Sequence, residues 1–576
     1  FMMLQWEKGF KKRQPFPNEA QHVGKILVWY YKLFSSAITA DAERSDSEDL
    51  NNGIRLLFSL ADVVEDDLKT IIENAFRNEK NAPNSVVGSL YDIIISNVLD
   101  GYESKEICKK YPDLVLEIAE ENWFYYPPTP EEINEMEKHF PFGVHYRSGI
   151  RIENDFGIKE STSRDYSPGS PYETPILNLL LVSPFKTLNF LIKLFNHAAD
   201  SYMNSDFGKD NQFLSRADAR SEIKVGMSDG RIIRQYASPT LWMMFRGTYT
   251  TVPCVLKSAL MALECYLLHI GKELKENNAG NYTELLKTVW DYSFDILISK
   301  SNSVITDAIL ISVAIDHMDF IGDKVLPLLK IKELYNFDLH RCLNETEAFS
   351  SVSYKKHARL RHLQLQNFQN LKHRSKNIED LVLGLSAGKH KEEILKIIDD
   401  FYSENPTDQA WRFALTRIDI RKYKVIDKVE DGYLMQTDLE EDLQKVVEQN
   451  LEKQELEHPV MSAAYWCMKK LSYQNVQDDN YVKWSQFYVI SKAAEFNEAI
   501  TSRNKHTALV AAIGIRDFHS CLSTGEKLWC HDKVIQLFKY ELFENKRNLD
   551  FLSAKYSLQE IEAVFSVIPI LMSHSE

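Results

Sequence analysis

The chain has 576 residues and a formal net charge of −15, with 68 Lys and Arg against 83 Asp and Glu. A hydrophobic fraction of 44% excludes a mostly disordered protein, and the acidic balance argues against general nucleic-acid binding, which needs a basic surface. With 21 Gly and 18 Pro, turn formers are too scarce for a sandwich or barrel. The composition predicts a helical protein of several domains, or one extended repeat array.

The N-terminus and the cysteines indicate the cellular setting. The chain begins with Phe1 in the run FMMLQWEKGFKKRQ, which lacks the charge-then-apolar order of a secretory signal. The chain also does not begin with Met, so we expect a segment of a longer polypeptide. The 7 cysteines follow no disulfide framework, and no apolar run approaches the roughly 18 residues needed to span a bilayer. These features predict a cytoplasmic protein without a membrane partner.

Proline-rich breaks divide the chain into four predicted segments. They interrupt otherwise helical patterns at 126–130, 166–175 and 404–408. We predict N-terminal helical pairs over 1–127, a linker or irregular helical region over 128–174, a central helical domain over 175–403 and a C-terminal helical domain over 404–576. The predicted fold is mainly α, an irregular HEAT- or TPR-like solenoid, although no strict repeat consensus is present.

One β-hairpin is predicted near 222–236, inside the central domain. The run EIKVGMSDGRIIRQY alternates about Asp229-Gly230, and an Asp-Gly pair supplies the positive φ that a tight turn requires. The strand-like residues are Ile223, Val225, Ile232 and Tyr236. We expect this hairpin as a small insertion in a helical chain.

The run PCVLKSALMALECYLLHIGKEL at 253–274 is apolar nearly all round, which predicts a helix at the centre of its domain. Glu264 lies inside this run, where a carboxylate is costly unless it is paired. Arg246 is the candidate partner, so we predict a buried structural ion pair. A catalytic role for Glu264 is less favoured, because no second acid, base or nucleophile lies near it in sequence. Four tryptophans are expected in cores: Trp242, Trp290, Trp411 and Trp466.

The sequence lacks three motifs of catalysis and nucleotide binding: the P-loop, G-x-G-x-x-G and H-E-x-x-H. The order Asp92, Glu103, Lys105 resembles a metal-dependent nuclease, but the helix-like context favours ordinary surface charges. Four possible zinc ligands have spacings that suit tetrahedral closure poorly: His519, Cys521, Cys530 and His531. We therefore predict no catalytic, cofactor-binding or metal-binding residues and no enzyme activity for this segment.

A basic run at 355–376 contrasts with the acidic whole, because it contains no acidic residue. It could bind an acidic partner, or its helix faces could pair with acidic neighbours in a stacked array; both interpretations stay open. The candidate partner-binding residues are Lys355, Lys356, Arg359, Arg361, Lys372 and Arg374.

Three stretches resemble one known protein family. The run SPTLWMMFRGTYTTVPCVLKSALMALECYLL at 238–268 carries the pattern W-x-x-x-R-G, a Val-Pro spacer and S-A-L-M-A-L-E. SPFKTLNFLIKLFNHAADSY at 183–202 and DQAWRFALTRIDIRKYKV at 408–425 agree in order and spacing. They resemble the C-terminal helical sensor region of bacterial STAND NTPases of the Avs (AVAST) antiphage type. The structural motif residues are Trp242, Arg246, Glu264, Trp411 and Arg412.

The resemblance implies a specific function. In that family, a C-terminal helical array recognises a conserved phage protein, of the terminase or portal class. Recognition drives oligomerisation, commonly to a tetramer, and activates an N-terminal effector. ATP and Mg would then be bound only by an upstream NTPase domain, and the protein would be a cytoplasmic bacterial one. Because these residues contain neither ATPase motifs nor an effector signature, no catalytic residue of the family can be placed on this sequence.

Two other functions are weighed against the sensor. The first is a general α-solenoid scaffold or adaptor without a defence role. The second is an enzyme, either a helical RNase or a degenerate nuclease, and it is disfavoured because the R-x₄₋₆-H motif is absent. We expect a phage structural or packaging protein as the partner and no direct nucleic-acid binding. The effector type and the identity of the sensed protein are not encoded in these residues.

Overall fold

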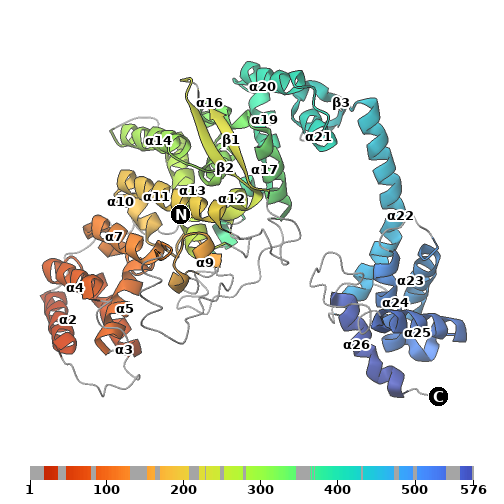
Figure 1. The fold of residues 1–576 in the computed structure, drawn as a ribbon, viewed down its shortest axis with the longest axis horizontal. Helices are drawn as coiled ribbons and strands as arrows, with labels where there is room; N and C mark the ends of the chain where they lie inside the picture. The colour runs from red at the N-terminus through yellow and green to blue at the C-terminus, as the bar shows by residue number, and fades with distance from the viewer. Residues whose placement is uncertain are drawn as a thin grey trace. The chain divides into compact units, whose positions relative to one another are not determined.

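The computed structural model is mainly helical, with two small two-stranded antiparallel sheets among the residues described (Figure 1). The predicted mainly-α class with a hairpin insertion is therefore confirmed, whereas the irregular HEAT- or TPR-like solenoid stays a prediction. The structure describes residues 18–36, 47–78, 86–129, 152–162, 166, 169–205, 219–227, 229–246, 252–276, 281–344, 363–364, 366–368, 370–429, 432–471, 479–496, 503–539 and 558–573.

The chain forms two compact units. Unit 1 comprises residues 1–207, 218–406 and 417–421, and unit 2 comprises residues 208–217, 407–416 and 422–576. Helix α21 (Gln409–Ile418) and the 3₁₀ turn η7 (Ile420–Lys422) lie where the chain passes between the units. The division into four segments made from the sequence stays a prediction.

Unit 1 contains most of the helices and the first sheet. Its elements are α2 (Asn18–Ser36), α3 (Ser47–Ser59), α4 (Glu65–Asn78), α5 (Val86–Leu99), α6 (Lys105–Lys110), α7 (Pro112–Trp123), α9 (Ile152–Asp155), η3 (Glu160–Thr162), α10 (Ile176–Val182), α11 (Pro184–Asn204), β1 (Ser221–Gly226), β2 (Ile232–Ala237), α12 (Pro239–Met243), η4 (Met244–Arg246), α13 (Cys254–Glu276), α14 (Asn281–Ser299), α15 (Ile305–Asp316), α16 (Met318–Leu329), α17 (Lys332–Asn344), η6 (Lys372–Ser375), α19 (Ile378–Ser386) and α20 (Lys391–Ser403).

Side chains fix the starts of two helices that matter below. At α12, the Ser238 hydroxyl accepts a hydrogen bond from the Leu241 N–H at 3.1 Å, and a proline occupies the first helical position. At α19, Asn377 Oδ1 accepts from the N–H groups of Glu379 and Asp380, and the Asp380 carboxylate accepts from the Asn377 N–H. This reciprocal capping box fixes the residue at which α19 begins.

Helix α13 is the centre of unit 1, as its sequence predicts. It packs against α10, α14, α15 and η4, so both its apolar faces are covered. Among the described residues it is also the single helix long and apolar enough to cross a membrane, but 78% of its most apolar window is buried within the protein. This burial is the pattern of a core helix.

The β1–β2 hairpin is confirmed, with all four predicted strand residues in the paired strands. Gly230 has φ +84°, and the Asp229 carboxylate accepts a hydrogen bond from the Arg231 N–H, as an Asp-Gly turn requires. The Tyr236 backbone bonds to residues 302 and 304, immediately before α15. The hairpin is thereby joined to the core of unit 1.

Asp307 in the first turn of α15 is fully buried beside this hairpin. Burial raises the pKa of its carboxyl to about 8, although a weak hydrogen bond from the Gln235 amide on β2 at 3.4 Å opposes the rise. Its second oxygen has no hydrogen-bond partner in the part of the chain that the structure describes. Asp307 therefore folds as a neutral acid at neutral pH.

The free energy of unfolding should fall as pH rises from about 4 to about 8, because only the unfolded chain ionises Asp307 in that range. The slope from one proton is about 1.4 kcal/mol per pH unit. Asp307→Asn mimics the neutral acid, so this variant should lose that part of the slope and exceed the wild-type melting temperature at pH 8. Thermal unfolding from pH 5 to 8 measures the difference.

The control for this titration is Asp295→Asn, at an exposed position on α14, which should keep the wild-type slope. Equal slopes for the wild type and for Asp307→Asn would contradict the burial of a neutral carboxyl at position 307.

Unit 2 contains the second sheet and a helical core. Its elements are β3 (Tyr423–Val429), β4 (Gly432–Thr437), α22 (Glu441–Leu471), α23 (Tyr481–Ala494), α24 (Arg503–Phe518), η8 (His519–Cys521), α25 (Thr524–Lys539) and α26 (Leu558–Ser573). Helix α24 is central, since α22, α23, α25 and α26 all pack on it. Trp484 is completely buried in this core, and its indole N–H donates to the Val510 carbonyl at 2.8 Å.

Gly514 lets α24 approach this tryptophan. A Cβ atom at position 514 would lie 2.5 Å from the ring of Trp484 and 3.1 Å from Cys530 Sγ. Gly514→Ala should destabilise unit 2 by about 1–3 kcal/mol through overpacking. Gly525→Ala meets no atom within 4 Å and should be neutral or stabilise by up to about 1 kcal/mol. Urea unfolding of both variants tests this contrast, and equal effects would contradict it.

Candidate functional site

Glu264 in α13 is the centre of a buried ionic cluster. Its carboxylate lies 3.2 Å from Arg246 Nη1 of η4 and 2.5 Å from Arg374 Nη2 of η6. The Ser312 hydroxyl of α15 donates to Glu264 and accepts from Arg246 Nη2 at 2.9 Å. These four side chains are at most 3% exposed. The predicted Arg246–Glu264 pair is confirmed. The fold adds Arg374 as a second arginine, which was not predicted because it lies far from Glu264 in sequence.

The charges in this cluster explain why a buried carboxylate is stable here. Burial alone raises the pKa of Glu264, but Arg246, Arg374 and His373 together outweigh burial and hold that pKa well below its usual range. Glu264 is therefore ionised at neutral pH. Because both arginines face the same carboxylate, losing it would leave two buried cations without their anion.

A second buried ion pair, between Asp338 and Arg341, holds the chain a few residues after Arg374. Asp338 of α17 accepts from the Trp242 indole N–H at 2.9 Å and from Arg341 Nε at 2.6 Å. Asp338 also accepts from the Ile378 N–H at 2.7 Å, and Arg341 donates to the Lys376 carbonyl at 2.6 Å. We call residues 370–378 the clamp segment, because these two pairs fasten it against α13 and α17.

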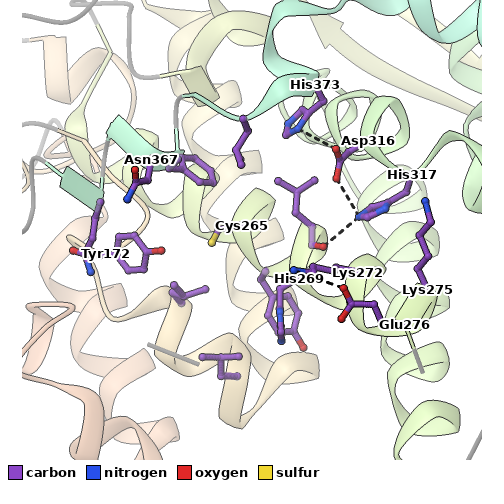
Figure 2. A pocket seen from close by; sticks show the side chains of 17 residues that line it. Tyr172, Cys265, His269, Lys272, Lys275, Glu276, Asp316, His317, Asn367 and His373 are labelled. Atoms are coloured by element: carbon purple, nitrogen blue, oxygen red, sulfur yellow. Dashed lines mark hydrogen bonds and ion pairs between the residues drawn. The ribbon is translucent and has the colours of Figure 1, made fainter. Parts of the chain in front are cut away.

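The clamp segment forms one wall of a pocket of about 680 Å³ beside the ionic cluster (Figure 2). The C-terminal half of α13 forms the opposite wall, and α10 and the junction of α15 with α16 complete it. Ligand-binding pockets have volumes of about 300–1,000 Å³, so the size is that of a small-molecule site. It combines apolar and titratable side chains.

Asp316 lies between two imidazoles in this pocket (Figure 2). Its oxygens are 3.5 Å from His373 Nδ1 and 3.6 Å from His317 Nε2. The hydrogen bond from His373 lowers the pKa of Asp316, so Asp316 stays ionised. Burial lowers the pKa of His317, whose Nε2 also lies 3.2 Å from the Leu268 carbonyl. His317 is therefore neutral at pH 7 and donates to that carbonyl.

Cys265 also lines the pocket, beside Tyr172 (Figure 2). Burial raises the pKa of the Cys265 thiol to about 11, so it is a thiol and not a thiolate at neutral pH. Burial likewise raises the pKa of the Tyr172 hydroxyl far above its usual value. Neither side chain has the lowered pKa of an activated nucleophile, so the pocket is suited to binding more than to covalent chemistry.

The structure describes two of the six candidate residues of the basic run, Lys372 and Arg374. Lys355, Lys356, Arg359 and Arg361 lie outside the described residues. Lys372 is exposed on η6, as a partner-binding residue requires. Arg374, two residues later, is 3% exposed and is bound to Glu264, so it stabilises the fold and is not on a partner-facing surface. Sequence spacing missed this because Glu264 and Arg374 are 110 residues apart.

The motif residues of the 408–425 stretch are also explained by ion pairs. Within unit 2, Arg412 Nη1 is 2.6 Å from Asp442 Oδ2, and Arg412 also pairs with Glu440. Within unit 1, Arg417 Nη2 is 2.7 Å from Glu379 Oε1. Trp411 is partly buried, whereas Trp242, Trp290 and Trp466 are in cores. This stretch therefore fixes local structure on both sides of the junction.

The weaker chemical candidates are placed as follows. Asp92 lies on α5, and Glu103, in the turn before α6, pairs with Arg55 of α3 at 3.0 Å, which is an ordinary structural ion pair. The rings of His519 and His531 are stacked with centroids 6.5 Å apart. Among the described residues, no group of three or more His, Cys, Asp or Glu side chains is arranged to hold a metal ion.

Comparison with models of known protein families finds no match, and comparison with curated proteins finds none either.

Glu264→Ala should lower the free energy of unfolding of unit 1 by about 3–5 kcal/mol, because it leaves Arg246 and Arg374 buried without their carboxylate. Urea unfolding followed by tryptophan fluorescence measures the loss. Lys372→Ala is the matched control on the same 3₁₀ turn, and its exposed side chain should contribute little. An unchanged melting temperature for Glu264→Ala would contradict a structural role for the cluster.

Proposed function

We propose that this chain is the protein-sensing helical segment of a STAND-type antiphage protein of bacterial cytoplasm. It would bind a conserved phage protein of the terminase or portal class and so trigger oligomerisation and effector activation. The resemblance of the three stretches at 183–202, 238–268 and 408–425 to Avs sensor regions motivates this proposal. The observation that carries its protein-binding part is the surface of the β3–β4 hairpin.

The β3–β4 hairpin exposes apolar side chains on both faces. Val425 lies opposite Met435 in the register, so these two share one face, whereas Leu434 is paired with Asp427. A register irregularity between Val425 and Asp427 displaces Ile426. The exposed fractions of the four apolar residues are 48–58%. Apolar side chains on both faces of a hairpin favour contact with another protein.

The backbone of the same hairpin supports this function. The described sheet contains only β3 and β4, so each strand has one edge without a strand partner. An isolated two-stranded hairpin is marginally stable in water, and its open edges can pair with a strand of a partner. The apolar side chains would add specificity to that backbone pairing.

The alternative is a general helical scaffold without a defence role. The same hairpin would serve a host adaptor equally well, since exposed apolar strands do not encode the source of the partner. The two functions differ in the partner they predict: a phage structural or packaging protein for the sensor, and a host protein for the scaffold.

The test uses purified large terminase subunits and portal proteins of tailed phages against the full chain, with affinity measured by biolayer interferometry. The double variant Ile426→Lys, Met435→Lys should weaken binding at least about tenfold, because both charges would be desolvated in the interface. Ile232→Lys is the matched control, since Ile232 is 67% exposed on the other hairpin and should bind normally.

Two results would decide against parts of this proposal. Equal affinities for the double variant and the Ile232→Lys control would exclude the β3–β4 hairpin as the interface. If neither phage protein bound, and the chain retained the same host proteins from infected and uninfected lysates, the scaffold would replace the sensor.

A further inference from the structure

The pocket beside the ionic cluster has an apolar part that is not filled by the fold. Leu177 and Leu181 of α10 line one side, and Leu268 of α13 lines the floor. The segment that leads into the clamp contributes the remaining apolar side chains, Phe368 and Leu371. Phe368 is held in place, because the Arg374 guanidinium stacks 4.2 Å from the centre of its ring. An apolar wall fixed by a buried ion pair is a preformed surface for an aliphatic or aromatic group.

The polar end of the pocket contains charges that are almost balanced. Lys272 Nζ lies 3.7 Å from Glu276 Oε1, so the charges of these two side chains compensate each other. Asp316 is the second anion, and its oxygens lie 3.5 Å from His373 Nδ1 and 3.6 Å from His317 Nε2.

Lys275 is the remaining charge at this end. It lines the pocket beside His317, and no residue that the structure describes lies close enough to form an ion pair with it (Figure 2). Its charge acts on both Asp316 and His317, which places it near them. The imidazole of His317 is neutral, so Lys275 is the cation that a ligand would meet.

This balance selects the charge of a ligand. Lys275 offers a ligand one ammonium group that has no ion-pair partner among the described residues, which fits one negative charge, whereas a phosphate dianion would bring a second negative charge close to Asp316 and Glu276. The neutral thiol of Cys265 offers no covalent attachment, so binding would be reversible.

We propose that this pocket binds a small amphipathic carboxylate, with its apolar chain between α10, α13 and the clamp segment and its carboxylate at Lys275. Medium-chain fatty acids have this chemistry. No residue that lines this pocket belongs to the β3–β4 hairpin of unit 2. The pocket proposal can therefore be tested separately from the protein-sensing function.

The probe is decanoate, and isothermal titration calorimetry on the full chain measures its binding, with 1-decanol as the uncharged analogue. We expect saturable binding of one decanoate per chain and weaker binding of decanol. Lys275→Met should weaken decanoate binding about fivefold and leave decanol binding unchanged, because only the carboxylate uses the ammonium group. Lys287→Met on α14 is the matched control and should bind both as the wild type does.

Leu181→Trp tests the apolar end. Leu181 is 38% exposed at the pocket, so a larger side chain can be accommodated there without burying it in the core. This variant should abolish binding of both probes while keeping the wild-type melting temperature. Non-saturable binding, binding that survives Leu181→Trp, or an equal effect of Lys275→Met on decanoate and decanol would each overturn the proposal.

Discussion

The buried carboxylate of Glu264 is the constraint on which unit 1 depends. A charge at the centre of an apolar helix is costly unless cations pair with it. Here two arginines form ion pairs with Glu264, one that precedes the helix in sequence and one that follows it. Arg246 precedes the helix, and Arg374 lies 110 residues after Glu264. The pair therefore fastens a distant segment against α13, and that segment becomes the wall of a pocket.

The same logic explains the W-x-x-x-R-G pattern. Trp242 and Arg246 lie four residues apart, and each contacts an acid that also holds the clamp segment: Asp338 through the indole N–H, and Glu264 through the guanidinium. The pattern thus encodes an attachment point for a third element. A short motif that resembles a family can in this way report a shared packing arrangement without carrying any catalytic residue.

The two hairpins show how similar local sequences acquire different uses. Both contain an Asp-Gly pair between β-prone runs, at 229–230 and 431–432. The first is joined to the core through backbone bonds of Tyr236, and its Gln235 side chain contacts the buried Asp307. The second leaves Ile426 and Met435 about half exposed. The second hairpin was not predicted from the sequence, although it contains the same Asp-Gly signal.

Composition and periodicity alone determined the mainly helical class, the first hairpin, the central position of α13 and the need of Glu264 for a cation. These features depend on residues near one another in sequence, where helical and strand periods are legible. Only the tertiary structure decided that Arg374 is buried and not available to a partner, that Asp338 joins Trp242 to the clamp segment, and that the pocket exists. Each of these depends on residues brought together by packing across long stretches of chain, and the burial that sets their charges and pKa values has no local signature.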